Sequence, residues 1–322
     1  MSTAAGPVDH ADRSRTLAVI GAVLLLVGLG CLALGPAEMY CFCFFTEGGR
    51  FHYEGFGFGS FMFAFLAMQI LGYYVIALVC IPLGYGHLRP RRWARTLALA
   101  GMGFWGVVGL PLVVVFLVVW LLAKDLSVGT VIASLPAMAL LYPVLPLLLT
   151  RFYRSRDVCR TFESRDPKSY WTEDLPLPLL TLCMLYISWA LALHIAILLR
   201  SAFPLFGVLV TDLPGALWID AAVLGLLCVT WGTFKRRAWA WWGALVGFGL
   251  WTLSTVWTLS SLSWLQLLRV LKFAKLEMEA LDGVPLQGWH LAAFVGLPLV
   301  GTLAVILYAK PHFRTDRATK AS

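Results

Sequence analysis

Two ionisable side chains inside long apolar segments, Asp220 and His194, are the residues of this sequence best suited to chemistry. Asp220 lies about two turns into the segment 214–234, and His194 lies at a similar depth in the segment 177–199. An ionised side chain in hydrocarbon is costly unless it is paired or hydrated. If the two segments pack side by side, Asp220 and His194 form either a proton relay or cation site, or a hydrogen-bonded pair that only joins two helices.

Hydroxyl and amide side chains form a second candidate set within the apolar segments. Its members are Ser254, Thr258 and Ser261, which share one face of the segment 240–262, and Gln69, Tyr73 and Tyr74 in the segment 60–84. Such side chains either line a substrate path or bond to neighbouring helices and to their own preceding carbonyls. The second use is the commoner one.

A third set carries side chains of the types that bind metals. It comprises Glu38, Cys41, Cys43, Glu47, His52, Glu54 and His290. Thiolate and imidazole suit a soft or borderline metal. However, Cys-x-Cys alone is a weak pattern, and His52 and His290 come from distant loops. We therefore expect no metal and no cofactor, and ordinary loop residues or a disulfide in this region.

The composition indicates that the solvent around this chain is a bilayer. Hydrophobic residues make up 60% and charged residues 13% of the 322 positions, and the mean hydropathy is +0.81. A helix needs about 20 apolar residues to cross hydrocarbon, where the backbone must satisfy its own polar groups. The sequence predicts an all-α polytopic helix bundle with about eight spans, at 16–35, 60–84, 96–123, 130–150, 177–199, 214–234, 240–262 and 291–309. The first span is long for a cleaved signal, so we expect it to be retained.

The placement of charge predicts the topology. Most of the 25 Lys and Arg residues fall in loops on one side of the predicted membrane. The positive-inside rule then places both chain ends in the cytoplasm. The formal charge of +8 is a topology signal with some attraction to anionic lipid, and no nucleic-acid partner is expected. On the outer side we expect the aromatic loop 36–59 and an amphipathic helix at 264–282.

Two similar turns favour an internal repeat. The turn 91–95 (RRWAR) joins the second and third spans, and the turn 235–241 (KRRAWAW) joins the sixth and seventh. A duplicated four-helix unit explains this and gives two halves in parallel orientation, although basic and tryptophan residues also collect at any cytoplasmic interface. The predicted parts are a tail at 1–15, a first unit at 16–150, a connecting loop at 151–176, a second unit at 177–309 and a tail at 310–322.

One resemblance rests on the RRWAR turn and on the segment 153–158 (YRSRDV) followed by Phe162. With these motifs the chain resembles bacterial multi-pass inner-membrane proteins of unknown function, which implies a bacterial inner membrane as its location. The resemblance covers about the central third of the chain, and it implies no activity and no catalytic residue.

These observations favour a non-enzymatic membrane protein, an interaction, assembly or envelope component that meets lipid and a protein partner or a second copy of itself. The predicted spans hold few ionisable groups, and motifs such as HExxH and GxSxG are absent from the sequence. Two alternatives stay open. One is a small-solute or ion transporter that uses Asp220, His194 and the hydroxyl face of the seventh span. The other is a membrane-embedded enzyme acting on lipid or quinone through His52 and His290.

Overall fold

Long apolar helices dominate the structure. The computed structural model describes residues 11–52, 57, 60–122, 128–273, 275–282 and 286–313, so parts of both predicted tails lie outside the described residues. Seven of the described helices are long and apolar enough to cross a membrane. The bent pair α10 and α11, whose axes differ by 104°, passes the same test together and gives up to eight spans. The predicted all-helical, multi-pass fold is confirmed.

The first group of helices comes from residues 14–154. It contains α1 (Ser14–Phe45), α2 (Phe61–Leu88), α3 (Arg92–Leu122) and a fourth span made of α4 (Val128–Ala139), the π-turn η1 (Leu140–Val144) and α5 (Leu145–Arg154). Pro136, Pro143 and Pro146 all lie in this fourth span. Proline lacks an N–H and its ring clashes with the preceding turn, so the regular α-helical hydrogen bonds are interrupted there by the short π-helix η1.

The second group comes from residues 177–309. Its spans are α8 (Leu177–Leu198), α9 (Asp212–Phe234), α10 (Ala238–Ser261) and α13 (Gly288–Ala309), which ends in the short turn η2 (Lys310–His312). A hairpin of β1 (Phe203–Leu205) and β2 (Val208–Val210) joins α8 to α9, with Phe203 opposite Val210. The two groups meet where α3 packs against α8 and α13.

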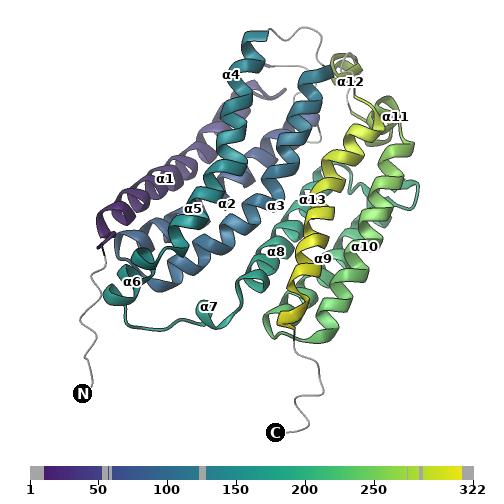
Figure 1. Ribbon diagram of the computed structural model, residues 1–322. Coiled ribbons are helices and arrows are strands. Elements are labelled where there is room, and N and C mark those ends of the chain that lie inside the picture. The colour runs from purple at the N-terminus through teal and green to yellow at the C-terminus, as the bar shows by residue number, and fades with distance from the viewer. Residues whose placement is uncertain are drawn as a thin grey trace, which may run out of the picture.

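Short helices mark the two ends of the bundle. They are α6 (Arg156–Arg165), α7 (Trp171–Asp174), α11 (Trp264–Leu271) and α12 (Lys275–Asp282). Figure 1 shows the start of α1, the end of α13, α6 and α7 at one end, which we call the α6 end. Helices α11 and α12 lie at the other end of the bundle. The hairpin is at this end too, since Ala202, just before β1, packs against Leu268 and Leu271 of α11. We call it the hairpin end.

Small residues bring α1 and α2 into close contact. Gly21, Gly28, Gly35 and Phe42 are the buried positions along most of α1, at a strict seven-residue spacing. This spacing keeps one side of a helix against its partner, and glycine lets the backbones approach, which is how helices associate in lipid. The predicted loop 36–59 is therefore wrong for residues 36–45. Helix α1 continues through Pro36 because its contact face continues to Phe42, whose ring lies 5.4 Å from that of Phe63.

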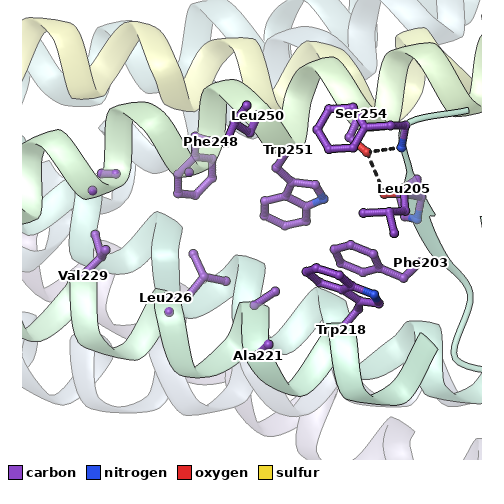
Figure 2. A pocket seen from close by; sticks show the side chains of 17 residues that line it. Phe203, Leu205, Trp218, Ala221, Leu226, Val229, Phe248, Leu250, Trp251 and Ser254 are labelled. Atoms are coloured by element: carbon purple, nitrogen blue, oxygen red, sulfur yellow. Dashed lines mark hydrogen bonds between the residues drawn. The ribbon is translucent and has the colours of Figure 1, made fainter. Parts of the chain in front are cut away.

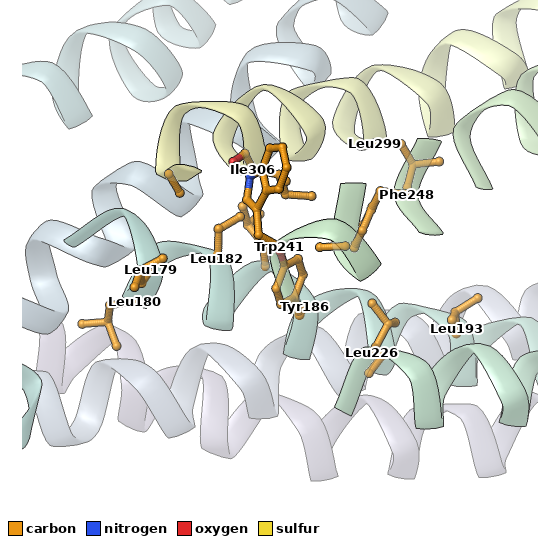
Figure 3. Close-up of a cluster of buried hydrophobic side chains, with 14 of the residues drawn as sticks. Leu179, Leu180, Leu182, Tyr186, Leu193, Leu226, Trp241, Phe248, Leu299 and Ile306 are labelled. Carbon is orange, nitrogen blue, oxygen red and sulfur yellow. Dashed lines mark hydrogen bonds between the residues drawn. The ribbon is translucent and has the colours of Figure 1, made fainter. Parts of the chain in front are cut away.

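The core of the second group is aromatic. Figure 3 shows Tyr186 of α8 and Trp241 and Phe248 of α10 within one cluster of buried side chains. The rings of Tyr186 and Phe248 stack at 5.4 Å, and the indole N–H of Trp241 donates to the carbonyl of Ile306 at 2.8 Å. These contacts fix α8, α10 and α13 relative to one another.

The predicted amphipathic helix 264–282 is two helices in the structure. Lys272 adopts a left-handed conformation (φ 56°) that ends α11, and α12 begins at Lys275. The break lets α12 turn toward the first group. There both carboxylate oxygens of Glu277 accept hydrogen bonds from the free N–H groups that begin α2, from Phe61 at 3.1 Å and from Met62 at 3.2 Å. A carboxylate at this position also matches the positive end of the helix dipole.

Replacing Gly21 with leucine should separate α1 from α2. A Cβ at Gly21 would lie 2.8 Å from the Gly84 carbonyl oxygen and 2.9 Å from the Leu88 nitrogen, which are backbone atoms. Because overpacking costs about 1–3 kcal/mol, we expect Gly21→Leu to lower the unfolding temperature of the detergent-solubilised protein by several degrees. A Cβ at Gly30 meets nothing within 4 Å. Gly30→Leu is therefore the matched control, and an equal loss in both variants would contradict the close α1–α2 contact.

Candidate functional site

Asp220 and His194 lie on the neighbouring helices α9 and α8, and both side chains are exposed at the surface of the bundle. Within the described part of the chain, no hydrogen bond or ion pair joins them. His194 instead places Nδ1 2.7 Å from the carbonyl oxygen of Ala190. Since a carbonyl only accepts, Nδ1–H donates this bond and leaves Nε2 as an acceptor in the neutral ring.

The surroundings of Asp220 are apolar. Large exposed side chains flank it along the outward face of α9, namely Leu213, Leu217, Leu224, Leu227 and Trp231. Asp220 stands eight residues after Asp212, the start of α9, or about 12 Å along the helix at 1.5 Å per residue. The structure therefore presents a single carboxylate within a lipid-type surface, about a third of the way along a candidate span.

The hydroxyl groups of α10 hold the hairpin. Figure 2 shows Ser254 Oγ between two hairpin atoms: it accepts from the N–H of Phe206 at 2.8 Å and donates to the carbonyl of Pro204 at 2.9 Å. Thr258 Oγ1 accepts from the N–H of Gly207 at 2.9 Å. We expected these side chains to bond to neighbouring helices or to their own preceding carbonyls, but Ser254 and Thr258 bond to a hairpin that the sequence did not predict.

The other members of the predicted polar path lie apart. Ser261 donates to the carbonyl of Thr258 in its own helix at 2.9 Å. Gln69 lies in the first group of helices, where its amide donates to Glu38 Oε1 of α1 at 2.9 Å. The hydroxyl of Tyr73 donates to the same oxygen at 2.8 Å. In the described structure, therefore, Gln69 does not extend the α10 hydroxyls into one path.

The cluster of Glu38, Gln69 and Tyr73 joins candidates that the sequence had kept separate. Glu38 was grouped with metal-type residues because the loop 36–59 was expected to carry it, and the helical extension of α1 moves it onto the α1–α2 contact. Gln69 and Tyr73 are four residues apart and share one face of α2. The sequence analysis named both of these residues, but it did not place Glu38 with them.

A groove lies between α9 and α10. It has a volume of about 480 Å³, within the range of about 300–1,000 Å³ of small-molecule sites. Figure 2 shows Trp251 reaching into it from α10, with Phe203 and Trp218 at its hairpin end. Its lining is almost entirely apolar, and includes Phe203, Leu205, Trp218, Leu226, Phe248 and Trp251. We call this feature the lateral groove.

Charged residues collect at the α6 end and tie α7 to α3. Asp166 is buried, 2% exposed, and accepts from the backbone N–H of Arg92 at 3.3 Å and from the Arg91 guanidinium at 3.4 Å. Arg92 in turn pairs with Glu173 at 2.8 Å. Burial raises the pKa of Asp166, but hydrogen bonds from the Tyr170 hydroxyl and the Arg92 N–H, with the charge of Arg91, outweigh it. The pKa of Asp166 consequently lies below its ordinary value.

The metal-type residues form no cluster of three or more that could hold a metal, as far as the described residues go. Glu54 lies outside them. His52 bonds to the carbonyl of Glu47, and His290 Nδ1 accepts from the N–H of Gln287 at 2.9 Å at the start of α13. Cys41 and Cys43 are exposed and free.

Comparison of the chain with protein-family models, with curated proteins and with solved structures gives no match.

Loss of the Ser254 hydroxyl should loosen the hairpin. Ser254→Ala removes the acceptor of the Phe206 N–H and the donor to Pro204. We expect the Phe206 amide to exchange its hydrogen at least tenfold faster, because a net hydrogen bond is worth about 1 kcal/mol and two are removed. Hydrogen exchange followed by mass spectrometry measures this. The control is Ser260→Ala, because Ser260 is exposed and bonds only to its own helix. If hydrogen exchange at the hairpin is unchanged in Ser254→Ala, the Ser254 hydroxyl does not hold the hairpin.

The Asp166 network should stabilise the protein in a pH-dependent way. Because the pKa of Asp166 is lowered in the folded state, its stabilisation is present above the ordinary value of 3.8 and is lost as pH falls through the lower folded pKa. We expect Asp166→Asn to unfold several degrees below the wild type at pH 7, with the gap narrowing below pH 4. Thermal unfolding in detergent at both pH values is the measurement. Asp174→Asn, at an exposed position nearby, should show no gap at either pH.

Proposed function

We propose that this protein is a non-enzymatic assembly component of the bacterial inner membrane that associates with a second copy of itself through the outward faces of α8 and α9. Both chain ends lie in the cytoplasm in this arrangement, in line with the positive-inside rule. The exposed carboxylate of Asp220 carries the proposal, because a lone ionisable group facing lipid is costly and a partner that covers it removes the cost.

His194 and Asp220 make this surface complementary to itself. Each copy exposes one imidazole on α8 and one carboxylate on the adjacent α9. In a two-fold dimer with its axis along the membrane normal, both copies keep the same depth, so the Asp220 of each faces the His194 of the other. A protonated ring donates Nε2–H to the carboxylate, and a neutral ring accepts from a protonated carboxyl, so the two side chains match in either state.

The depths of the two residues are compatible with such a pair. His194 stands four residues before the end of α8 at Leu198, and Asp220 stands eight residues after the start of α9. At 1.5 Å per residue these positions are about 6 Å and about 12 Å from the hairpin end. The difference of about 6 Å is within the combined reach of the two side chains. Exposed Ile187, Leu191 and Ile197 on α8 and Leu217 and Leu224 on α9 supply apolar surface around the pair.

The test is dilution of the protein in liposomes with the dimer fraction read by single-molecule photobleaching. Polar pairs between membrane helices contribute about 0.6 to 1.7 kcal/mol each, so removing both symmetric pairs should weaken the dimer roughly tenfold. We expect this loss in Asp220→Leu and in His194→Leu. The exchanged double variant, Asp220→His with His194→Asp, should recover most of the dimer.

The control is Leu307→Ala, which trims an exposed apolar residue of α13 and should leave the dimer fraction unchanged. A wild-type protein that stays monomeric at all densities would overturn the proposal. So would single variants that dimerise like the wild type, or an exchanged variant no better than the singles.

A further inference from the structure

The lateral groove has a shape that helix packing does not explain. Gly225 of α9 and Gly247 of α10 line it, and a Cβ added to either would meet nothing within 4 Å. These glycines differ from Gly21 and Gly84 in the first group, where an added Cβ would collide with backbone atoms. A glycine inside a helix lowers stability by about 1 kcal/mol relative to alanine. At Gly225 and Gly247 this loss is not offset by a close helix contact, because both glycines border open space.

The groove opens sideways. Gly225, Gly243 and Gly247 are exposed at its mouth, and Leu250, another lining residue, is 52% exposed. The hairpin closes the end of the groove, with Phe203 stacked at 6.2 Å on Trp218, and the hydroxyl bonds of Ser254 hold it in place. An occupant must therefore enter between α9 and α10 at the depth of the candidate spans, where the surrounding solvent is hydrocarbon.

Two tryptophan indoles line this apolar space. Trp218 and Trp251 both line the groove, and Figure 2 shows their indole rings within it. Among the described residues, neither indole N–H donates a hydrogen bond, whereas Trp189 and Trp241 elsewhere in the bundle both do. An indole is a donor only, so an occupant that satisfies these groups carries an acceptor. Trp218 lies six residues from the start of α9, which is about 9 Å along the helix from the hairpin end.

We propose that the lateral groove binds one acyl chain of a membrane glycerophospholipid, with the ester carbonyl of that chain accepting a hydrogen bond from the Trp218 indole. The apolar walls of Leu226, Phe248 and Trp251 hold the chain, the glycines leave the width for it, and the hairpin stops it at the ester end. The site lies on a different side of α9 from Asp220, since Trp218, Ala222, Gly225 and Val229 follow the helical repeat of the groove face. It therefore does not depend on self-association.

The experiment uses the full chain in liposomes that contain a phosphatidylethanolamine probe with a photoreactive diazirine in its acyl chain. After illumination, digestion and mass spectrometry locate the labelled residues. We expect labelling to concentrate on the groove residues Leu226, Phe248 and Trp251. Gly247→Leu, which fills the groove, should reduce this labelling at least fivefold.

Gly249→Leu is the matched control. Gly249 also has nothing within 4 Å of an added Cβ, lies two residues away on the same helix, and does not line the groove. A second variant, Trp218→Phe, keeps the ring and removes only the N–H donor, and it should shorten the retention of the probe during detergent washing at least twofold. Labelling spread evenly over the outward faces of α9 and α10, or an equal effect of Gly247→Leu and Gly249→Leu, would show annular lipid only and overturn the site.

Discussion

Hydrocarbon offers no hydrogen bonds, and this constraint governs the whole structure. Within the spans, the hydroxyls of Thr230, Thr252 and Thr302 donate to carbonyls one turn back in their own helices. Other side chains find a partner on another element, as Ser254 does on the hairpin and Tyr73 does on α1. Asp220 differs from these residues because it is exposed among apolar side chains and, in the described part of the chain, has no hydrogen-bond partner. The proposed function follows from this contrast.

Two kinds of helix contact divide the molecule. In the first group, glycines let α1 and α2 approach at backbone distance, so the contact is narrow and rigid. In the second group, aromatic side chains fill the wider spaces between α8, α10 and α13. The groove between α9 and α10 follows neither pattern, because Gly225 and Gly247 face open space there. A groove accessible to lipid and an outward carboxylate thus occur on the same helix, on different sides of it.

Hydropathy predicted the helical class and about eight spans, against seven or up to eight in the described structure, since it depends on solvent and hardly on tertiary contacts. The end of α1 could not be predicted in the same way. Pro36 and the aromatic residues after it are typical of a loop, and only contact with α2 keeps residues 36–45 helical. The hairpin also escaped prediction, because the anchor that stabilises the short strands is formed by Ser254 and Thr258 about 50 residues later. Among the candidate residues, the sequence identified Asp220, His194, Ser254 and Thr258 as unusual but could not say which way each side chain points.

The Glu277 cap can form only late in synthesis. Glu277 accepts a hydrogen bond from the N–H of Phe61, which precedes it by 216 residues. At a synthesis rate of about 5–20 residues per second, roughly 10–40 s separate the two during translation. Throughout that interval the start of α2 has only water or lipid headgroups for these amides. The start of α2 is therefore synthesised well before the side chain that caps it.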